Sequence, residues 1–199
     1  SGNPTVSFSK IRGLGGKPLI PPKAIENAIA SILKSIGEDT HREGLRDTPK
    51  RVAELYCDLF SGINKDPATE LSITYNEEFR GLILLRDIPF HSMCEHHLLP
   101  FFGIAHVGYK PRGRIVGAGK LVRALDVLAR RPQLQERLTD QLANVIFDTL
   151  EAEGVAVVIK AEHLCLSLRE TQKSGTQVVT TATRGTIGEE TLLSVLQCT

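Results

Sequence analysis

The chain has 199 residues, with 24 Lys and Arg against 23 Asp and Glu, so its formal net charge is +1. This length suits one domain with a sizeable core, and the near-zero charge argues against a general nucleic-acid binder, which carries a basic excess. No apolar run reaches the roughly 18–20 residues of a membrane span, and no signal peptide is recognisable. Four scattered cysteines do not form the framework of a secreted disulfide protein. We therefore expect a cytoplasmic protein that binds neither nucleic acid nor membrane.

The first 80 residues predict an arm followed by helices. Residues 1–20 contain Gly and Lys without periodicity, which predicts a flexible N-terminal arm. Apolar residues then recur with the period of a helix over 25–36 and again over 48–60. Residues 63–78 are polar and predict a loop. We interpret residues 21–80 as an N-terminal helical region.

From Gly81 onward the pattern changes to strands and helices in pairs. Branched and apolar runs predict four strands, and apolar residues with helical spacing predict two long helices and a short one at the C-terminus. The strands are expected over 82–90, 101–109, 155–169 and 177–183, and the long helices over 121–128 and 132–150. Two strand pairs separated by a helix pair indicate an α+β domain over residues 81–199, with an antiparallel four-stranded sheet covered on one face by helices.

Two short segments carry metal-binding residue types. Cys94 and His97 form a C-x-x-H pair directly after the first strand of this domain, a spacing that can present sulfur and imidazole to one metal. The second segment lies in the strand predicted over 155–169. Because side chains alternate along a strand, one face would carry His163, Cys165, Ser167 and Arg169.

Together, these segments predict a zinc site. Cys94, His97 and Cys165 offer two thiolates and one imidazole, a donor set that suits Zn²⁺. Three protein ligands with an open fourth position are typical of catalytic zinc, whose bound water can supply hydroxide near neutral pH. His96 and His163 remain beside it and can transfer protons. The alternatives are a closed structural site, with one of these two histidines as fourth ligand, or no metal.

At this point the residues resemble a known family. The segments Cys94–Pro100, Arg131–Leu138 and His163–Cys165 have the order and spacing of GTP cyclohydrolase I, and the resemblance runs from about Gly44 to Gly185. It implies a tunnelling fold (T-fold) with added N-terminal helices, assembled as a ring-stacked homodecamer with active sites where subunits meet. The implied reaction opens the imidazole ring of GTP, releases C8 as formate and closes a new ring to give 7,8-dihydroneopterin triphosphate.

The resemblance also implies roles for individual residues. Zinc on its three ligands would activate the water that attacks C8, while His96 and His163 pass protons to purine N7 and the ribose ring oxygen. The alternative for both histidines is to orient a metal ligand. Glu136 would bind guanine with Gln135 beside it. The cations expected on the triphosphate are Lys120, Arg123, Arg169 and Arg51. The alternative for each charged residue is an ordinary solvated surface charge.

One departure from the family concerns the phosphate-binding segment. The chain reads Gly117-Ala118-Gly119-Lys120 where family members usually have Gly-Leu-Ser-Lys, so the hydroxyl before the lysine is missing. Two other functions therefore remain open. The first is an altered paralogue that stops at an earlier intermediate or a cyclic phosphate. The second is a silent subunit that binds GTP or a pterin, although the complete Cys94/His97/Cys165 set argues against it.

Overall fold

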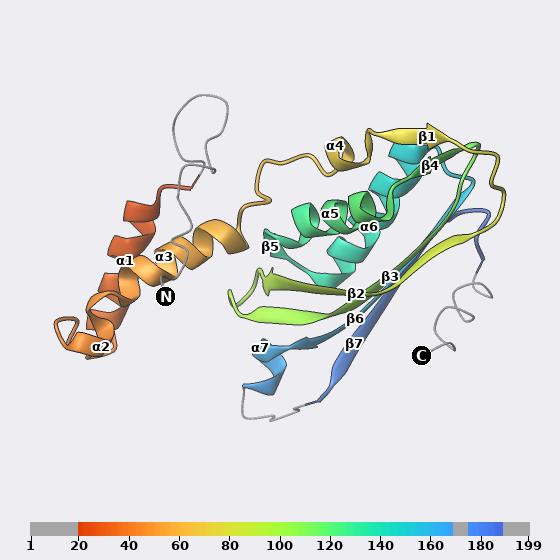
Figure 1. The fold of residues 1–199 in the computed structure, drawn as a ribbon. Coiled ribbons are helices and arrows are strands. Elements are labelled where there is room, and N and C mark those ends of the chain that lie inside the picture. The colour runs from red at the N-terminus through yellow and green to blue at the C-terminus, as the bar shows by residue number, and fades with distance from the viewer. Residues whose placement is uncertain (1–19, 169–174, 189–199) are drawn as a thin grey trace, which may run out of the picture. The chain divides into compact units, whose positions relative to one another are not determined.

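Figure 1 presents the computed structural model of the chain, which describes residues 20–168 and 175–188. Contacts divide the chain into two units, residues 1–58 and 59–199. The arm predicted over residues 1–20 lies outside the described residues apart from Ile20, and the predicted C-terminal helix lies outside them as well.

The first unit is helical. Its helices are α1 (Pro22–Ser35), α2 (Glu43–Arg46) and α3 (Thr48–Leu59), the last ending one residue into the second unit. Helix α1 has proline in its first turn, where the missing N–H costs no hydrogen bond. It ends before Gly37, whose φ of +89° favours glycine. Both helices predicted over 25–36 and 48–60 are therefore confirmed.

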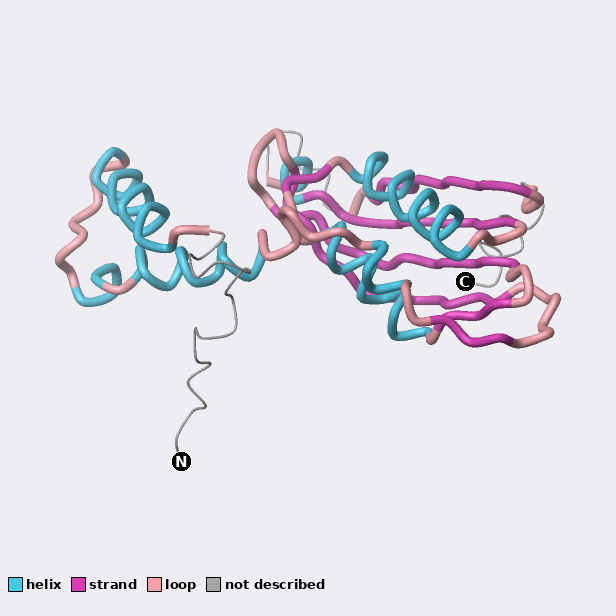
Figure 2. The backbone as a smooth tube through the Cα atoms, turned by 90° about the horizontal axis from the view of Figure 1, so that it is seen from above, coloured by secondary structure: helices cyan, strands magenta, loops and turns pink. Residues whose placement is uncertain are grey.

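The second unit is built on a five-stranded sheet with the order β5-β2-β3-β6-β7. Its strands are β2 (Ile83–Cys94), β3 (Pro100–Lys110), β5 (Pro132–Gln133), β6 (Gly154–His163) and β7 (Gln177–Gly185). The four long strands pair antiparallel, and the two-residue β5 pairs parallel with the end of β2. Figures 1 and 2 show α5 (Ala118–Ala129) and α6 (Gln135–Leu150) lying over one face of this sheet. The predicted α+β arrangement is confirmed, but the sheet has five strands and not four, because Pro132 and Gln133, predicted to begin a helix, form β5.

The segment predicted as a loop over 63–78 contains regular structure. It forms α4 (Ala68–Leu71) and β1 (Thr74–Asn76), and β1 pairs antiparallel with β4 (Arg114–Val116). Asp66 explains where α4 begins, because its carboxylate accepts a hydrogen bond from the N–H of Ala68 at 2.9 Å. Both elements are short and mostly polar, so their hydrophobic periodicity is too weak to distinguish them from a loop.

The core of the second unit lies between the helix pair and the sheet. Leu121 and Leu125 of α5, Leu138 and Leu142 of α6 and Phe101 of β3 are each 0% exposed. Full burial of one such side chain stabilises the fold by about 1.5–3 kcal/mol. This packing fixes the ends of β2, β3 and β6 and the first turn of α6, which carry the residues of the site.

The strand predicted through Arg169 ends earlier, and that prediction is wrong. Strand β6 stops at His163, and Leu164–Ser167 form the helical turn α7, closed by a hydrogen bond from the N–H of Leu168 to Leu164 O at 2.9 Å. Residues 163–168 therefore do not alternate between two faces. Leucines at every second position have the spacing of a strand, which explains the wrong prediction. The hydrogen bonds within the segment stabilise a helical turn instead.

A buried histidine occupies β3 opposite a bulge in β2. The register between β2 and β3 shifts between Leu85 and Ile88, and Asp87 within this bulge has φ +55°. The N–H of Asp87 donates to Nδ1 of His106 at 3.2 Å, and His106 is 1% exposed. Burial lowers the pKa of His106, an effect that Asp87 opposes and that Arg86 and Lys160 reinforce.

This histidine predicts a loss of stability in acid. The unfolded chain binds a proton at His106 below about pH 6.5, whereas the folded chain resists that proton. Stability conferred by the neutral ring is therefore complete above about pH 6.5 and is lost as the pH falls toward the lowered folded pKa. We expect the urea midpoint to fall from pH 7 to about pH 5, and to fall less steeply in His106→Gln. Equal slopes in the two proteins would contradict this prediction.

Candidate metal centre

The loop between β2 and β3 fixes the first predicted ligands. Cys94 is the last residue of β2, and a turn over 95–97 follows. The N–H of Cys94 donates to Leu99 O at 2.9 Å, and the N–H of Leu98 donates to Cys94 O at 2.8 Å. Leu98 has φ +51°, a left-handed conformation that is uncommon for a branched residue and typical of functional sites. The loop backbone is thus held on both sides of His97.

The third predicted ligand arrives from the neighbouring strand. Phe101 of β3 pairs with His163, the last residue of β6, so the chain leaves β6 beside the start of β3. The helical turn α7 begins at the next residue and places Cys165 in its middle, 8% exposed. The sulfur of Cys165 therefore reaches the metal group from a helical turn and not from a strand.

These residues form one compact group of donors. One ligand atom each from Cys94, His97 and Cys165 lies within 4.8 Å of the others, and Cys94 Sγ is 3.8 Å from His97 Nδ1. A tetrahedral zinc with ligands at about 2.0–2.3 Å separates its ligands by roughly 3.3–3.8 Å. Two buried thiols and an exposed imidazole at this spacing fit Zn²⁺ with little rearrangement.

The group has three members among the residues that the structure describes. Neither His96 nor His163 belongs to it. The ring of His96 is exposed and lies edge-on to His97, with 6.1 Å between the ring centroids. Three donors leave one tetrahedral position for a small molecule, which is the arrangement of catalytic zinc sites.

His163 is held by its surroundings on two sides. Its ring stacks on Phe101, with 4.7 Å between the centroids and 5° between the planes. Its Nε2 lies 2.7 Å from Oε1 of Gln135, the first residue of α6. Burial lowers the pKa of His163, and the nearby carboxylate of Glu136 partly offsets that effect.

An ion pair joins the metal-binding loop to α6. The two terminal guanidinium nitrogens of Arg137 donate to the carboxylate of Glu95, at 2.5 and 2.9 Å. This hydrogen bonding lowers the pKa of Glu95 and raises that of Arg137. A bidentate pair of this kind also fixes orientation. Sequence reasoning left Glu95 without a role, although Arg137 stands beside Glu136 in the segment that carries the resemblance.

The first turn of α6 places the two predicted base-binding residues differently. Glu136 is exposed and its carboxylate is available to a ligand. Gln135 is 1% exposed and points into the protein, where its amide bonds to β6, β7 and His163. Sequence reasoning did not find these contacts, because they join residues that are 24 to 43 positions apart.

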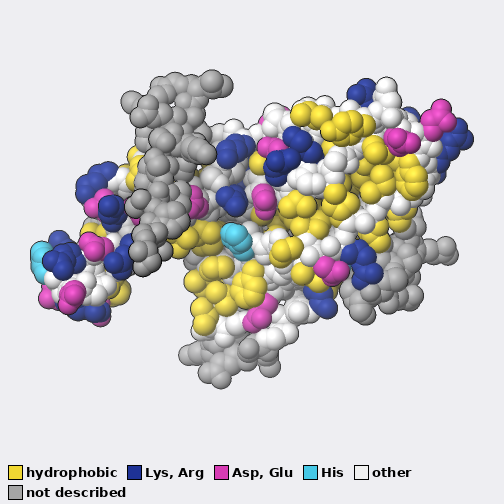
Figure 3. Space-filling view, in the orientation of Figure 1, with side chains coloured by type: hydrophobic (Ala, Val, Ile, Leu, Met, Phe, Trp, Pro, Cys, Tyr) yellow, Lys and Arg dark blue, Asp and Glu magenta, His cyan; other side chains and the backbone are white. Residues whose placement is uncertain are grey.

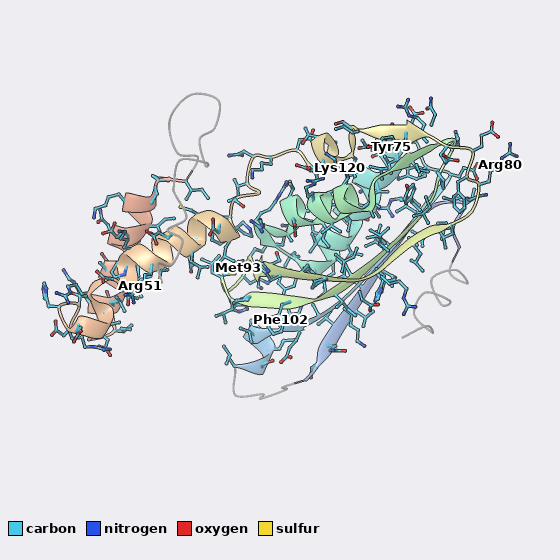
Figure 4. The ribbon with its side chains drawn as sticks, viewed as in Figure 1. Arg51, Tyr75, Arg80, Met93, Phe102 and Lys120 are labelled. Carbon is cyan, nitrogen blue, oxygen red and sulfur yellow. The ribbon has the colours of Figure 1, made fainter. Side chains whose placement is uncertain are left out.

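The predicted phosphate-binding cations lie on several elements. Lys120 is half-buried in the first turn of α5 (Figure 4). Arg123, one turn further, lies 3.5 Å from Glu70 and lines a cavity that also contains Lys65 and Arg130. Arg51 belongs to α3 of the first unit, 3.7 Å from Asp47. Arg169 lies outside the described residues.

The elements that carry the metal group also carry exposed apolar side chains. Leu98, Phe102, Leu166 and Leu168 are between 39% and 68% exposed, on the loop, β3 and α7. Figure 4 places Phe102 on β3 near the end of the sheet where Met93 precedes Cys94. The face drawn in Figure 3 carries broad apolar areas, and a patch of histidine lies beside them. No helix among the described residues has both the length and the apolar character of a membrane span.

The fold and the site together define an α+β protein with a Cys-His-Cys group that could hold a metal ion. The family model of GTP cyclohydrolase I matches residues 25–196. Curated relatives named GTP cyclohydrolase 1 include those of Dehalococcoides mccartyi, 52% identical over 82% of this chain and 87% of that protein, and Streptococcus suis, 51% identical over 85% and 91%. The chain belongs to the GTP cyclohydrolase I family.

One further relative and one solved structure are also similar to the chain. The GTP cyclohydrolase 1 of a Geobacillus species is 52% identical over 84% of this chain and 90% of that protein. Among solved structures, the archaeosine synthase QueF-Like in its apo form has a TM-score of 0.43 at 19% identity, covering 56% of this chain and 100% of that one. That structural likeness is too low to carry an argument, so the family rests on the sequence relatives.

Proposed function

We propose that this chain is a zinc-dependent GTP cyclohydrolase I, which opens the imidazole ring of GTP, releases formate and forms 7,8-dihydroneopterin triphosphate. The observation that carries the proposal is the three-membered donor group of Cys94, His97 and Cys165 in a chain of this family. Bound there, zinc would lower the pKa of a coordinated water and so provide a nucleophile near neutral pH.

The chain's own residues would bind the substrate and move protons. His163, two residues before Cys165 and stacked on Phe101, and the exposed His96 beside His97 would exchange protons with the purine and the ribose. The carboxylate of Glu136 can accept two hydrogen bonds from guanine N1–H and the 2-amino group. Lys120, Arg123, Arg169 and Arg51 would neutralise the triphosphate. Lys120 and Arg123 share the first turns of α5, whose N-terminal N–H groups favour anions.

We propose that the enzyme is a cytoplasmic homo-oligomer with the tunnelling fold, a decamer as in the family, with sites where subunits meet. The exposed apolar side chains on the elements that carry the metal group support an assembly, because burying Leu98, Phe102 and Leu168 against another copy would remove them from water. Light scattering on the purified protein measures the assembly directly. A monomeric species that turns over GTP would contradict the interface site.

The activity itself is tested by following formate and pterin from GTP. We expect zinc-loaded protein to release formate and to produce the fluorescent pterin, with the product mass of 7,8-dihydroneopterin triphosphate. Formate without pterin would identify an altered paralogue that stops early. Binding of GTP without formate would identify a silent subunit.

Because Gly119 stands before Lys120, we predict that formate and the pterin product form at different rates. The family resemblance gives the serine that is usual at position 119 a part in the ribose rearrangement, whereas zinc hydrolysis at C8 depends on other residues. We therefore expect formate release to precede pterin formation, with an opened pyrimidine intermediate accumulating. Gly119→Ser should narrow that lag. The substitution fits, because Gly119 is helical and an added Cβ would meet no atom within 4 Å.

A second glycine in the same turn offers a matched control. Gly117 precedes α5 with φ −62°, and an added Cβ there also meets no atom within 4 Å. Gly117→Ser adds a hydroxyl two residues away and should leave the lag as it is. Matched formate and pterin time courses in the natural protein, unchanged by Gly119→Ser, would show that the missing hydroxyl has no kinetic consequence.

A further inference from the structure

The buried amide of Gln135 has a single possible orientation. Its Nε2 lies 3.0 Å from Ile159 O and 2.9 Å from Val178 O, on the neighbouring strands β6 and β7. Backbone carbonyls only accept hydrogen bonds, so the NH₂ end of the amide must face them. A flipped amide would bring its oxygen against two carbonyl oxygens in a site that is 1% exposed, at the cost of burying unpaired acceptors.

Hydroxyl groups of Thr139 and Thr180 complete this arrangement without conflict. Thr139 Oγ1 donates its hydrogen to the backbone carbonyl of Gln135 at 2.8 Å. The 2.6 Å contact between the two hydroxyls must therefore use the hydrogen of Thr180. Thr180 Oγ1 is then free to accept from Gln135 Nε2 at 3.1 Å. The two hydrogens of the amide serve three acceptors, so one hydrogen is shared, and all three acceptors face the nitrogen end of the amide.

This orientation determines the state of His163. With the nitrogen of the amide facing the strands, its oxygen faces His163 Nε2 at 2.7 Å. An amide oxygen cannot donate, so Nε2 must carry the hydrogen. In the neutral ring, the lone pair then resides on Nδ1. The stack on Phe101, itself 0% exposed, prevents the ring from turning away.

We infer that Gln135 is a positioning residue, which holds His163 in the tautomer with its hydrogen on Nε2 and directs all proton exchange to Nδ1. The inference deepens the proposed function, since it specifies how His163 would act in that reaction. A proton taken from the substrate adds to Nδ1 and gives an imidazolium whose Nε2–H remains bonded to Gln135. Because the amide cannot accept that proton, the proton returns to the substrate from Nδ1, and no relay runs through α6.

The first test measures the tautomer in the natural protein. Solid-state NMR of protein labelled with ¹⁵N and ¹³C histidine distinguishes the two neutral tautomers by their nitrogen and ring-carbon shifts. A difference spectrum against His163→Ala assigns the signals. At about pH 8, where imidazoles with ordinary pKa values near 6.5 are neutral, we expect His163 to carry its hydrogen on Nε2. A hydrogen on Nδ1 would overturn the inference, whatever reaction the protein catalyses.

The second test removes the amide while keeping its volume. Gln135→Met eliminates the bond to His163, so we expect its NMR signals to show a mixture of tautomers. We also expect kcat for formate release or pterin formation to fall by about 10- to 100-fold, within the range of general acid–base effects, with KM within about threefold. Zinc content should be unchanged, because Gln135 offers no metal ligand. Unchanged tautomer and unchanged kcat would overturn the inference.

Thr180→Val provides the matched control. It removes the two bonds of the Thr180 hydroxyl, to Gln135 and to Thr139, and leaves Gln135 with two carbonyl acceptors for its two hydrogens. We expect the tautomer to persist and kcat to stay within about threefold of the natural value. If both variants lower kcat equally with the tautomer intact, Gln135 has only a structural role. Should natural protein fail to act on GTP, the proposed function fails, and the tautomer measurement still decides the inference about Gln135.

Discussion

Replacing Cys165 with serine is expected to remove zinc and activity together. The sulfur belongs to a group of three donors within 4.8 Å, so its loss leaves two protein ligands for the metal. We expect purified natural protein to hold about one zinc per chain and Cys165→Ser to hold much less, with formate release falling more than about 100-fold, the upper end of what loss of an outer-sphere partner costs. His97→Ala should behave in the same way. Elemental analysis and the formate assay measure both quantities.

The chain contains its own control cysteine. Cys57 is 3% exposed on α3 in the first unit, where burial raises the pKa of its thiol and keeps it protonated. Cys57→Ser should therefore retain zinc and activity. Because thiolate ligands must be deprotonated, zinc retention in the natural protein should weaken toward acid pH. Full zinc occupancy in Cys165→Ser would exclude the proposed ligand set.

Glu136→Gln is expected to impair the use of GTP without affecting zinc. The substitution puts an NH₂ donor where a carboxylate oxygen would accept from the guanine N–H groups. Burying this mismatch should cost about 2–4 kcal/mol in kcat/KM for GTP. Steady-state kinetics with GTP give the value, and elemental analysis should find the same zinc content as in the natural protein, since Glu136 is outside the donor group.

The same helix supplies a comparison for Glu136. Asp148 is an exposed carboxylate near the other end of α6. Asp148→Asn removes the same charge from the same helix and should leave kcat/KM within about threefold. If Glu136→Gln turns GTP over as well as Asp148→Asn does, Glu136 is an ordinary surface residue and guanine binds elsewhere.

The long helices and strands could be predicted from the sequence for one physical reason, and the donor group for another. The long helices and strands bury one apolar face each, so their periodicity is visible in one dimension, as Leu138, Leu142 and Ile146 illustrate. Cys94 and His97 could be predicted as a pair because they are only three positions apart in the sequence. Cys165 lies within 4.8 Å of that pair, as the sequence predicted, although the strand argument that placed it there was wrong; its role as a metal ligand stays a prediction.

Contacts between distant segments were beyond the reach of such reasoning. No local pattern indicates that the amide of Gln135 bonds to His163, or that Arg137 pairs with Glu95, because each pair meets only after α6 has packed on the sheet. The amide of Gln135 illustrates the limit well. A glutamine beside Glu136 suggests a substrate contact, and only burial reveals that its hydrogens are directed to β6 and β7.

The connections between the metal-binding loop and α6 have a consequence for local opening. Cys94 pairs with Gln133 of β5, and the N–H of Glu95 donates to Gln133 O at 3.0 Å. The guanidinium of Arg137 donates to the carboxylate of Glu95. A turn between two strands normally frays alone and exchanges its amide hydrogens quickly. Here, opening the turn must break both the bond from the Glu95 N–H to Gln133 O and the pair between Glu95 and Arg137, whose partners lie in or next to the first turn of α6. The Glu95 amide should therefore exchange with deuterium at the slow rate of the sheet, as part of one cooperative unit with residues 133–138.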